Sequence, residues 1–246
     1  MARRPSPNIQ PVELLPPTKR IIRIVITSPK GGCGKTNTTR NLAAAAAHDG
    51  FSVSTADLDK QATLTRWARR RPGSVPGIVH YQVAWSDADA LTTSGGIDPC
   101  DVLFIDTPPS VEDHPAEMRR LLAYADLILV PCHATFDDIE SAVPFLQMLR
   151  QGGAKPVSIL NFSKPRQNVG AEKAMLLEAA ELCPVELGER ADYHRAGSKG
   201  LGLADVAGHT GAGEVKALWI FAKQRLGITA PQLTAPASEA PHVDAA

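Results

Sequence analysis

A glycine-rich loop between a predicted strand and a predicted helix constrains this chain more than any other feature of its sequence. Residues 21–26 (Ile-Ile-Arg-Ile-Val-Ile) are too short and too rich in β-branched side chains for a buried helix, and they predict a central parallel strand. A helix is predicted from Thr36 to about His48, because the five consecutive alanines in it favour helix and allow close packing on a sheet. The order of strand, loop and helix is typical of an α/β fold.

The loop, at residues 28–36, reads Ser-Pro-Lys-Gly-Gly-Cys-Gly-Lys-Thr and has the composition of a phosphate-binding site. Its glycines let backbone N–H groups converge on phosphate oxygens, and the N-terminus of the following helix adds a partial positive charge. In the general motif of this kind, Lys35 reaches the β- and γ-phosphates and the Thr36 hydroxyl ligates Mg²⁺. We therefore expect the loop to bind a nucleotide.

Two details separate this loop from the usual pattern. Pro29 occupies the position at which a first glycine is common, and a second lysine, Lys30, follows it directly. The structural alternative is a glycine-rich turn with incidental lysines. The preceding strand, the following helix and the Gly-Lys-Thr sequence together favour phosphate binding.

Three acidic residues follow predicted strands further along the chain. Asp57 and Asp59 come after the strand predicted at residues 51–56, and Asp106 follows the strand at 102–105. The carboxyl ends of parallel strands form the ligand-binding edge of an open α/β sheet, so these carboxylates are expected near the loop. A carboxylate there can hold Mg²⁺ through water, and another can orient an attacking water. Taken singly, each aspartate is more typical of a turn or a helix cap.

Taken together, these segments resemble a known family. Residues 30–36 (KGGCGKT), 57–61 (DLDKQ) and 105–110 (IDTPPS) are similar to the nucleotide-site motifs of the ParA/MinD family of deviant Walker ATPases, and within it of the small ParA-type partition ATPases. The resemblance covers residues 21–227. It implies an α/β fold of the deviant P-loop NTPase type, a three-layer sandwich with a mainly parallel sheet.

The resemblance also assigns roles to the residues of the site. Lys30 corresponds to the signature lysine, which reaches the phosphates of the opposite subunit in an ATP-bound homodimer, and Asp59 corresponds to the residue that positions the hydrolytic water. Lys35 completes the catalytic set. Mg²⁺ is assigned to Thr36, Asp57 and Asp106. Nucleotide binding is assigned to Gly31, Gly32, Cys33, Gly34, Lys35, Thr36, Asn37 and Asn161. Of these, Asn161 is expected near the adenine.

The function implied by the resemblance is ATP-dependent segregation of a plasmid or chromosome. A Mg²⁺-ATP-bound homodimer would bind nonspecific DNA, and a centromere-binding (ParB-like) adaptor protein would stimulate an otherwise slow hydrolysis. Two alternatives stay open: an ATPase that positions a protein cluster or acts in conjugative DNA transfer, and a nucleotide-dependent binding module with negligible turnover. Lys60 favours the second alternative, because it replaces the family's usual proline and adds a cation beside Asp59.

Composition fits a single globular domain with tails. The chain of 246 residues carries 26 basic and 26 acidic side chains, and 43% of its residues are hydrophobic. The extension at 1–20, which contains five prolines, is expected to be flexible, and the Ala/Pro-rich tail at 228–246 disordered. Since the sequence has neither a secretory signal nor a long apolar run, we expect a cytoplasmic protein without membrane association, close to the nucleoid if it binds DNA.

DNA binding has only local support in the sequence, because the net charge is zero. The candidate contact residues lie in the C-terminal third: Lys164, Arg166, Lys173, Arg190, Arg195 and Lys199. They are equally well interpreted as scattered solvated side chains. A further group of arginines at 66–71 predicts a solvated helix flank or, alternatively, contact with an anionic partner.

The remaining segments complete the predicted fold. Further strands are expected at 78–83, 127–131 and 157–161, the first of them at an edge. Helices are expected at 62–71, 136–150 and 213–226, the second kinked or started late by Pro144 and the third packed on the core rather than on a membrane. Residues 111–114, after Asp106, are the candidate switch that senses a γ-phosphate.

Overall fold

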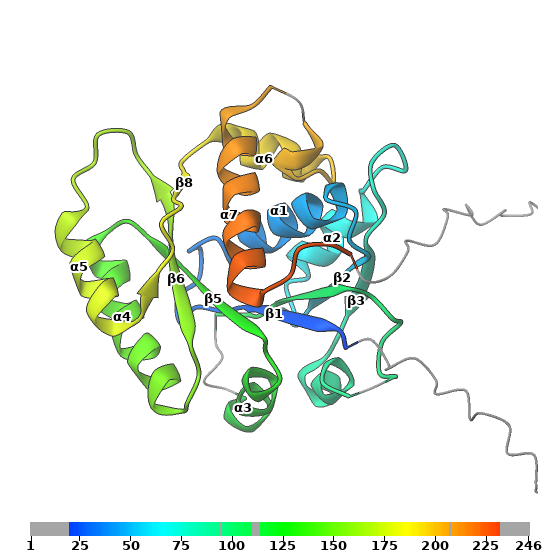
Figure 1. Ribbon diagram of the computed structural model, residues 1–246, viewed down its shortest axis with the longest axis horizontal. Coiled ribbons are helices and arrows are strands. Elements are labelled where there is room, and N and C mark those ends of the chain that lie inside the picture. The colour runs from blue at the N-terminus through cyan, green and yellow to red at the C-terminus, as the bar shows by residue number, and fades with distance from the viewer. Residues whose placement is uncertain (1–19, 94, 110–113, 207, 232–246) are drawn as a thin grey trace, which may run out of the picture.

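A parallel β-sheet covered by helices on both faces forms this protein, which confirms the predicted three-layer α/β fold (Figure 1). The computed structural model describes residues 20–93, 95–109, 114–206 and 208–231. Its strands are β1 (Ile22–Ile26), β2 (Val53–Asp57), β3 (Val79–Gln82), β4 (Val102–Asp106), β5 (Leu127–His133), β6 (Pro156–Ser163), β7 (Glu181–Leu182) and β8 (Leu187–Gly188). Its helices are α1 (Lys35–His48), α2 (Thr63–Arg69), α3 (Pro115–Ala123), α4 (Phe136–Gln151), α5 (Gly170–Ala179), α6 (Ala191–Ser198) and α7 (Thr210–Leu226), with 3₁₀ segments η1 (Trp85–Leu91) and η3 (Leu203–Asp205).

The strand order places the phosphate loop at the centre of the sheet. The order is β3-β2-β4-β1-β5-β6-β7, and β8 also pairs with β6. Every pairing between the described strands is parallel. In this register Asp106, at the end of β4, is the partner of Ile26 on one side and of Asp57 on the other. The two predicted acidic strand ends are therefore direct neighbours beside the loop that follows β1. The predicted edge strand is confirmed as β3.

Alternating side chains of the central strands bury both faces of the sheet. In β1, Val25 packs into the cluster formed with η1, α3, α4 and α5, whereas Ile24 and Ile26 pack into the cluster formed with α1, α6 and α7. The alanines of α1 are buried in the second cluster, as their small size suggested. Figure 1 shows α1, α6 and α7 on one side of the sheet and α3 on the other. The core thus fixes β1 and α1, and with them the loop between them.

Two helices refine the sequence-based expectation. The helix expected at 136–150 is confirmed as α4, which runs through Pro144 from Phe136 to Gln151, so the alternative of a late start at Pro144 is wrong. Pro144 lies on the exposed side of α4, where water can satisfy the carbonyl whose helical partner the proline lacks. Helix α7 begins at Thr210 instead of 213, so that it includes Gly211. A Cβ at Gly211 would lie 2.5 Å from Leu203, and the absence of a side chain lets the helix start close to that residue. The predicted packing of α7 on the core is confirmed, with Trp219 buried.

Some predictions concern residues outside the described part of the chain. The expected flexible extension at 1–20 is described only at Arg20, and the expected disordered tail at 228–246 only as far as 231. In the candidate switch, His114 is described and its ring stacks on Trp85 at 5.1 Å between centroids. Residues 111–113 lie outside the described residues.

Candidate functional site

The glycine-rich loop has a backbone conformation that depends on its glycines. Gly34, immediately before α1, has a φ of +95°, and Gly32 has a φ of +77°. Both values lie in the left-handed region that side chains disfavour. At Gly34 a Cβ would also lie 2.5 Å from Nδ2 of Asn161 and 2.9 Å from the Phe162 ring. The loop therefore rests directly on the carboxyl end of β6.

Asn161 of β6 supports this loop through its side chain. Its side chain is buried, and its Nδ2 donates hydrogen bonds of 3.1 Å to the carbonyl of Cys33 and to Oγ1 of Thr38. One bond fixes the loop and the other fixes the first turns of α1. This position gives Asn161 a structural role that its motif did not indicate. Its expected contact with adenine stays a prediction.

Lys35 points back into its own loop. Its side-chain Nζ donates to the carbonyl oxygen of Lys30 at 2.7 Å and lies 3.5 Å from that of Ser28. Lys35 is only 7% exposed. Carbonyl groups of the loop, rather than a carboxylate, accept the hydrogen bonds of its ammonium group. Such carbonyl contacts are neutral and can be exchanged for charge-assisted bonds to phosphate oxygens, which are stronger.

Asp106 is joined to the first two turns of α1 by two hydroxyl groups. Thr36 Oγ1 donates to Asp106 Oδ2 at 2.6 Å, and Thr39 Oγ1 lies 3.3 Å from Oδ1. Burial of this carboxylate raises its pKa to about 7, and the charge of Asp57 adds to the effect, although the Thr36 bond and Lys35 oppose it. A buried carboxylate with a raised pKa, next to a threonine hydroxyl, is a suitable place for a divalent cation to replace the proton.

Asp57 is used differently, although it lies beside Asp106 in the sheet. Its Oδ2 accepts hydrogen bonds from the backbone N–H of Thr65 at 2.9 Å and from Thr65 Oγ1 at 3.0 Å. Thr65 lies in the first turn of α2, where backbone N–H groups lack helical partners. Asp57 thus caps α2, the role that is typical of a single aspartate. Its expected part in Mg²⁺ binding stays a prediction.

Asp59 lies in the turn between β2 and α2. The Oδ1 of Asp57 accepts a hydrogen bond from the Asp59 N–H at 3.0 Å, and Asp59 Oδ1 accepts one from the Gln61 N–H at 2.8 Å. Asp59 is half-buried, whereas Lys60 is exposed. The turn is closed by Ala62, whose φ of +51° is unusual for a residue with a side chain. Asp57 therefore positions both α2 and the carboxylate of Asp59.

Lys30 is tied to the start of α4 within the same chain. Its Nζ donates to the carbonyl oxygen of Asp137 at 2.9 Å and lies 3.0 Å from Asp138 Oδ1. Asp138 Oδ2 lies 3.3 Å from His133 Nδ1, and His133 Nε2 lies 3.1 Å from the Gly32 carbonyl. In this arrangement Lys30 points toward α4 rather than toward Lys35. The two lysines of the loop are therefore held by separate contacts.

The residues of the loop fit a nucleoside triphosphate with Mg²⁺. The N-terminus of α1 has no side-chain cap, so its backbone N–H groups and the glycine-rich loop are suited to phosphate oxygens. Mg²⁺ is commonly held by one or two protein oxygens together with phosphates and water, which matches Thr36 and Asp106. Within the described residues, no three His, Cys, Asp or Glu side chains form a metal-binding group, and the four cysteines are buried free thiols.

The chain around this site matches a family of known proteins. Residues 24–203, well over half of the chain, match the model of the CobQ/CobB/MinD/ParA nucleotide binding domain. The chain belongs to this family. The predicted resemblance to the ParA/MinD group of deviant Walker ATPases is confirmed.

Two curated proteins illustrate the range of ParA/MinD-type relatives. Maintenance of carboxysome distribution protein A from Halothiobacillus neapolitanus is 24% identical over 209 residues, which are 80% of this chain and 94% of that protein. Protein ParA from Rhizobium radiobacter is 30% identical over 129 residues, which are 52% of this chain and 56% of that protein.

Solved structures show that the ParA/MinD-type fold extends over most of the chain. MinD from Pyrococcus horikoshii, complexed with Mg-ADP, has a TM-score of 0.68 at 16% identity and covers 85% of this chain and 98% of its own. A protein from Borrelia burgdorferi B31 described as a plasmid partition protein, bound to AMPPNP, has a TM-score of 0.67 at 18% identity, with 83% and 100% covered. McdA from Cyanothece, complexed with ATP, has a TM-score of 0.64 at 18% identity, with 85% and 97% covered.

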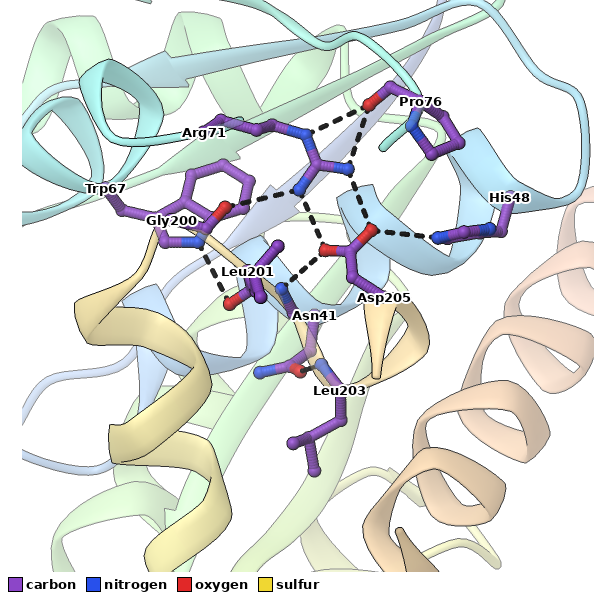
Figure 2. A network of polar contacts seen from close by, with 10 residues as sticks. Asn41, His48, Trp67, Arg71, Pro76, Gly200, Leu201, Leu203 and Asp205 are labelled. Carbon is purple, nitrogen blue, oxygen red and sulfur yellow. Dashed lines mark hydrogen bonds and ion pairs between the residues drawn. The ribbon is translucent and has the colours of Figure 1, made fainter. Parts of the chain in front are cut away.

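One buried ion pair in this ParA/MinD-type domain was not evident in the sequence. Arg71 and Asp205, with side chains 6% and 0% exposed, form two contacts of 2.9 and 3.0 Å, and His48 lies 2.8 Å from the same carboxylate (Figure 2). Arg71 also donates to the Pro76 carbonyl and lies over the ring of Trp67. The interpretation of residues 66–71 as a solvated flank is therefore wrong at Arg71. The pair joins the end of α2 to η3 and to the end of α1.

Most of the basic residues proposed for DNA contact already have carboxylate partners. Lys164 lies 3.7 Å from Glu189, and Lys173 lies 2.5 Å from Glu186. Arg190 pairs with Glu214, and Arg195 lies 3.4 Å from Asp192. Arg166 and Lys199 are exposed. In the described state, the positive charge of this ParA-like C-terminal third is thus largely balanced by its own acids. Within the described residues, no helix is long and apolar enough to cross a membrane.

Proposed function

We propose that this protein is a Mg²⁺-ATP-dependent ATPase that segregates or positions DNA and works as an ATP-bound homodimer. The observation that carries the proposal is the contact between Thr36 and Asp106, beneath a loop that presents two separately held lysines. Membership of the ParA/MinD family supports the nucleotide and its hydrolysis. The dimer, the DNA and a ParB-like adaptor rest on the ParA-type resemblance.

Each residue of the site would have a distinct role in ATP hydrolysis. When bound, Mg²⁺-ATP supplies the bond to be cleaved and a cation that balances the phosphate charge. Lys35 would exchange its bond to the Lys30 carbonyl for bonds to phosphate oxygens, and Thr36 and Asp106 would hold the metal. Asp59 orients the attacking water with the part of its carboxylate that Gln61 does not occupy, since a carboxylate accepts several hydrogen bonds.

Lys30 would act on the partner subunit. In the single chain it is held by Asp137 and Asp138, so it must leave α4 before it can reach the phosphates of a second copy. A cation supplied by a partner can contribute about 10³- to 10⁵-fold to the rate of phosphoryl transfer. We therefore expect the monomer to hydrolyse ATP very slowly.

Dimerisation would also control DNA binding. Each subunit has little unbalanced positive charge, because four of the six candidate basic residues are paired with acids. Two weak patches on one dimer bind DNA far more tightly than either does alone, through effective concentration. ATP would thus switch DNA binding on by joining two chains.

The test measures fluorescence anisotropy of a random-sequence DNA duplex with the Asp59→Ala variant, in ATP, in ADP and without nucleotide, at two salt concentrations. We expect binding in ATP only, weaker at high salt because Lys and Arg contacts release counterions. Lys30→Ala is the matched control and should abolish the ATP-dependent binding. Absence of binding at low salt would contradict the DNA part of the proposal.

A protein cluster is the second candidate cargo. The similarity to a carboxysome distribution protein along 94% of that protein's length favours it. If the Asp59→Ala variant dimerises in ATP but does not bind DNA, this result would support a protein cluster as the cargo. Turnover is tested separately by the hydrolysis rates of the wild type and of Asp59→Ala. Negligible hydrolysis by the wild type would favour a binding module, equal measurable rates would remove Asp59 from its proposed role, and loss of hydrolysis in the variant alone would support the ATPase.

A further inference from the structure

An apolar groove of about 910 Å³ lies between α3 and α4, at the amino-terminal edge of the sheet. This volume is in the range of ligand-binding clefts. The groove is on the opposite edge from the phosphate loop, because its lining includes the first residues of β5. Its apolar lining includes Met118, Leu122, Phe145, Met148 and Leu149.

The groove combines a buried floor with an exposed apolar rim. Phe145 and Leu149 of α4 and Met118 of α3 are buried in the core cluster of this face. Met148, one turn from Phe145 on the same helix, is 54% exposed. A hollow of this size, with apolar walls, marks a surface that another segment can cover.

The described part of the chain begins at the rim of this groove. Arg20, its first residue, lies 2.6 Å from Asp126 Oδ1, and Asp126 lines the groove. The other oxygen of Asp126 accepts a hydrogen bond from the Arg23 N–H, so the start of β1 is fixed at this point. At about 3.3 Å per extended residue, the chain before Arg20 can reach about 17 Å by Leu15 and about 36 Å by Ile9. The preceding segment therefore starts beside the groove and is long enough to span it.

The sequence of that segment complements the groove. Residues 9–15 read Ile-Gln-Pro-Val-Glu-Leu-Leu and contain four aliphatic side chains. Glu13 is the one acidic residue among the first 20, and the groove includes the basic side chains of Arg119 and Lys155. Pro11 lies within the segment, and Pro16 and Pro17 follow it directly. Prolines favour extended conformations, which would lower the entropy lost on binding.

We infer that residues 9–15 bind in cis in the groove between α3 and α4, with Leu14 and Leu15 near Met148 and Glu13 near Arg119 or Lys155. The N-terminal segment then acts as a strap that joins α3 to α4. This inference does not depend on the proposed nucleotide chemistry. Since α3 follows the loop after Asp106, the strap also sets the position of the helix nearest the candidate switch.

Hydrogen exchange of the full-length protein tests the strap. The double variant Leu14→Asp/Leu15→Asp should exchange several-fold faster than the wild type at the amides of α3 and α4, with no change in α1. Ser6→Asp/Asn8→Asp is the matched control, since it adds the same charge outside residues 9–15, and it should exchange like the wild type. Identical exchange of α3 and α4 in all three proteins would overturn the inference.

Cross-linking by a short bismaleimide tests the location of the strap independently. In full-length Leu15→Cys/Met148→Cys, we expect an intramolecular product, because the four native cysteines are buried. Leu15→Cys/Leu177→Cys is the control, since Leu177 is 61% exposed on α5, outside the groove, and should give no such product. Equal intramolecular yields in the two variants, or a product between two chains, would overturn binding in cis at this groove.

Discussion

Asp106 and Asp57 occupy equivalent positions on neighbouring strands but serve different parts of the molecule. Both end a buried strand, and they are direct partners in the register between β2 and β4. Asp106 accepts hydrogen bonds from the hydroxyls of Thr36 and Thr39 on α1. Asp57 instead accepts the backbone N–H and the hydroxyl of Thr65 on α2. The two carboxylates thus share a position at a strand end but differ in role, because Asp106 contacts α1 and Asp57 contacts α2.

This difference separates a chemical function from a structural one within a single edge of the sheet. The groups that contact Asp106 are side-chain hydroxyls, which can turn to a metal and be replaced in its coordination. A backbone N–H contacts Asp57, and its loss leaves the first turn of α2 without a cap. We therefore expect substitutions of the two residues to affect different measurements.

The largest expected contrast is between Asp106→Asn and Asp57→Asn. Asp106→Asn should weaken Mg²⁺-dependent ATP binding by about 10- to 100-fold, as for other metal-site residues, and leave stability at pH 8 unchanged or higher because a buried charge is removed. Asp57→Asn should lower the free energy of unfolding by about 1–2 kcal/mol through loss of the α2 contacts. Isothermal titration calorimetry with and without Mg²⁺, combined with urea unfolding, measures both quantities.

The two variants serve as controls for each other. If Asp57→Asn lost Mg²⁺-dependent affinity as strongly as Asp106→Asn without losing stability, the assignment of Asp57 to α2 would be contradicted and its predicted role as a metal ligand supported.

Gly34→Ala tests whether the Asp106 side of the site depends on the loop resting on β6. The new Cβ would approach Asn161 Nδ2 to 2.5 Å at a φ of +95°, so the loop must move, and we expect ATP binding to fall by at least about 10-fold with about 1–3 kcal/mol of lost stability. Gly32→Ala is the matched control. It also has a positive φ, of +77°, but no atom lies within 4 Å of its added Cβ. Its positive φ alone should cost about 1–2 kcal/mol of stability, with little loss of ATP affinity. Equal losses of affinity in the two variants, by nucleotide titration, would remove the role of the Asn161 contact.

Much of this arrangement could be predicted from the sequence, because it depends on local patterns. The β-branched run before the loop, the alanines of α1 and the acidic strand ends each indicate their element without reference to distant residues. The parallel order then brings Asp57 and Asp106 together at one edge. Sequence spacing could not assign Asp57 to Thr65, because that contact depends on where α2 begins and on the direction of the side chain.

Contacts between distant residues were the part that the sequence did not predict. Arg71 follows three other arginines and Trp67 on a helix, which indicates an exposed flank, yet its partner Asp205 lies 134 residues further along the chain. The resemblance places Asn161 near the adenine, which stays a prediction, but it did not indicate that the Asn161 amide contacts Cys33 and Thr38. In both cases the tertiary fold supplies the partner.

Thr65→Val should produce a smaller, purely structural effect on the Asp57 side. The valine keeps the N–H that Asp57 caps but removes the hydroxyl at 3.0 Å from Asp57 and the contact with His80 Nε2 at 2.9 Å. We expect about 0.5–1.5 kcal/mol of lost stability and unchanged ATP affinity. The counterpart, Thr39→Val, removes a hydroxyl from Asp106 and should change Mg²⁺-dependent affinity as well. Chemical denaturation and nucleotide titration of both variants distinguish the two sides, and a loss of affinity in Thr65→Val alone would reverse the assignment.

The smallest expected difference concerns the pH dependence of stability. Burial lowers the pKa of His80, which packs between Thr55 and Thr65; the charge of Arg69 acts in the same direction and that of Asp57 opposes it. Below pH 6.5 the unfolded chain therefore takes up a proton that folded His80 does not, and stability falls as the pH falls. The raised pKa of Asp106 has the opposite effect on stability. Between pH 3.8 and about 7 the folded chain keeps a proton that the unfolded chain releases, so this contribution to stability rises as the pH falls.

Removal of each group should reveal the pH slope that this group contributes to stability. Without nucleotide or metal, the difference in unfolding free energy between His80→Gln and the wild type should shift in favour of the variant as the pH is lowered from 7 to 5. Asp106→Asn should shift in the opposite direction over the same range, since it no longer gains from protonation. Each slope is at most about 1.4 kcal/mol per pH unit, the limit for one proton. Urea unfolding at intervals of half a pH unit measures these slopes. If the differences from the wild type had slopes of the same sign in the two variants, the opposite effects expected for His80 and Asp106 would be contradicted.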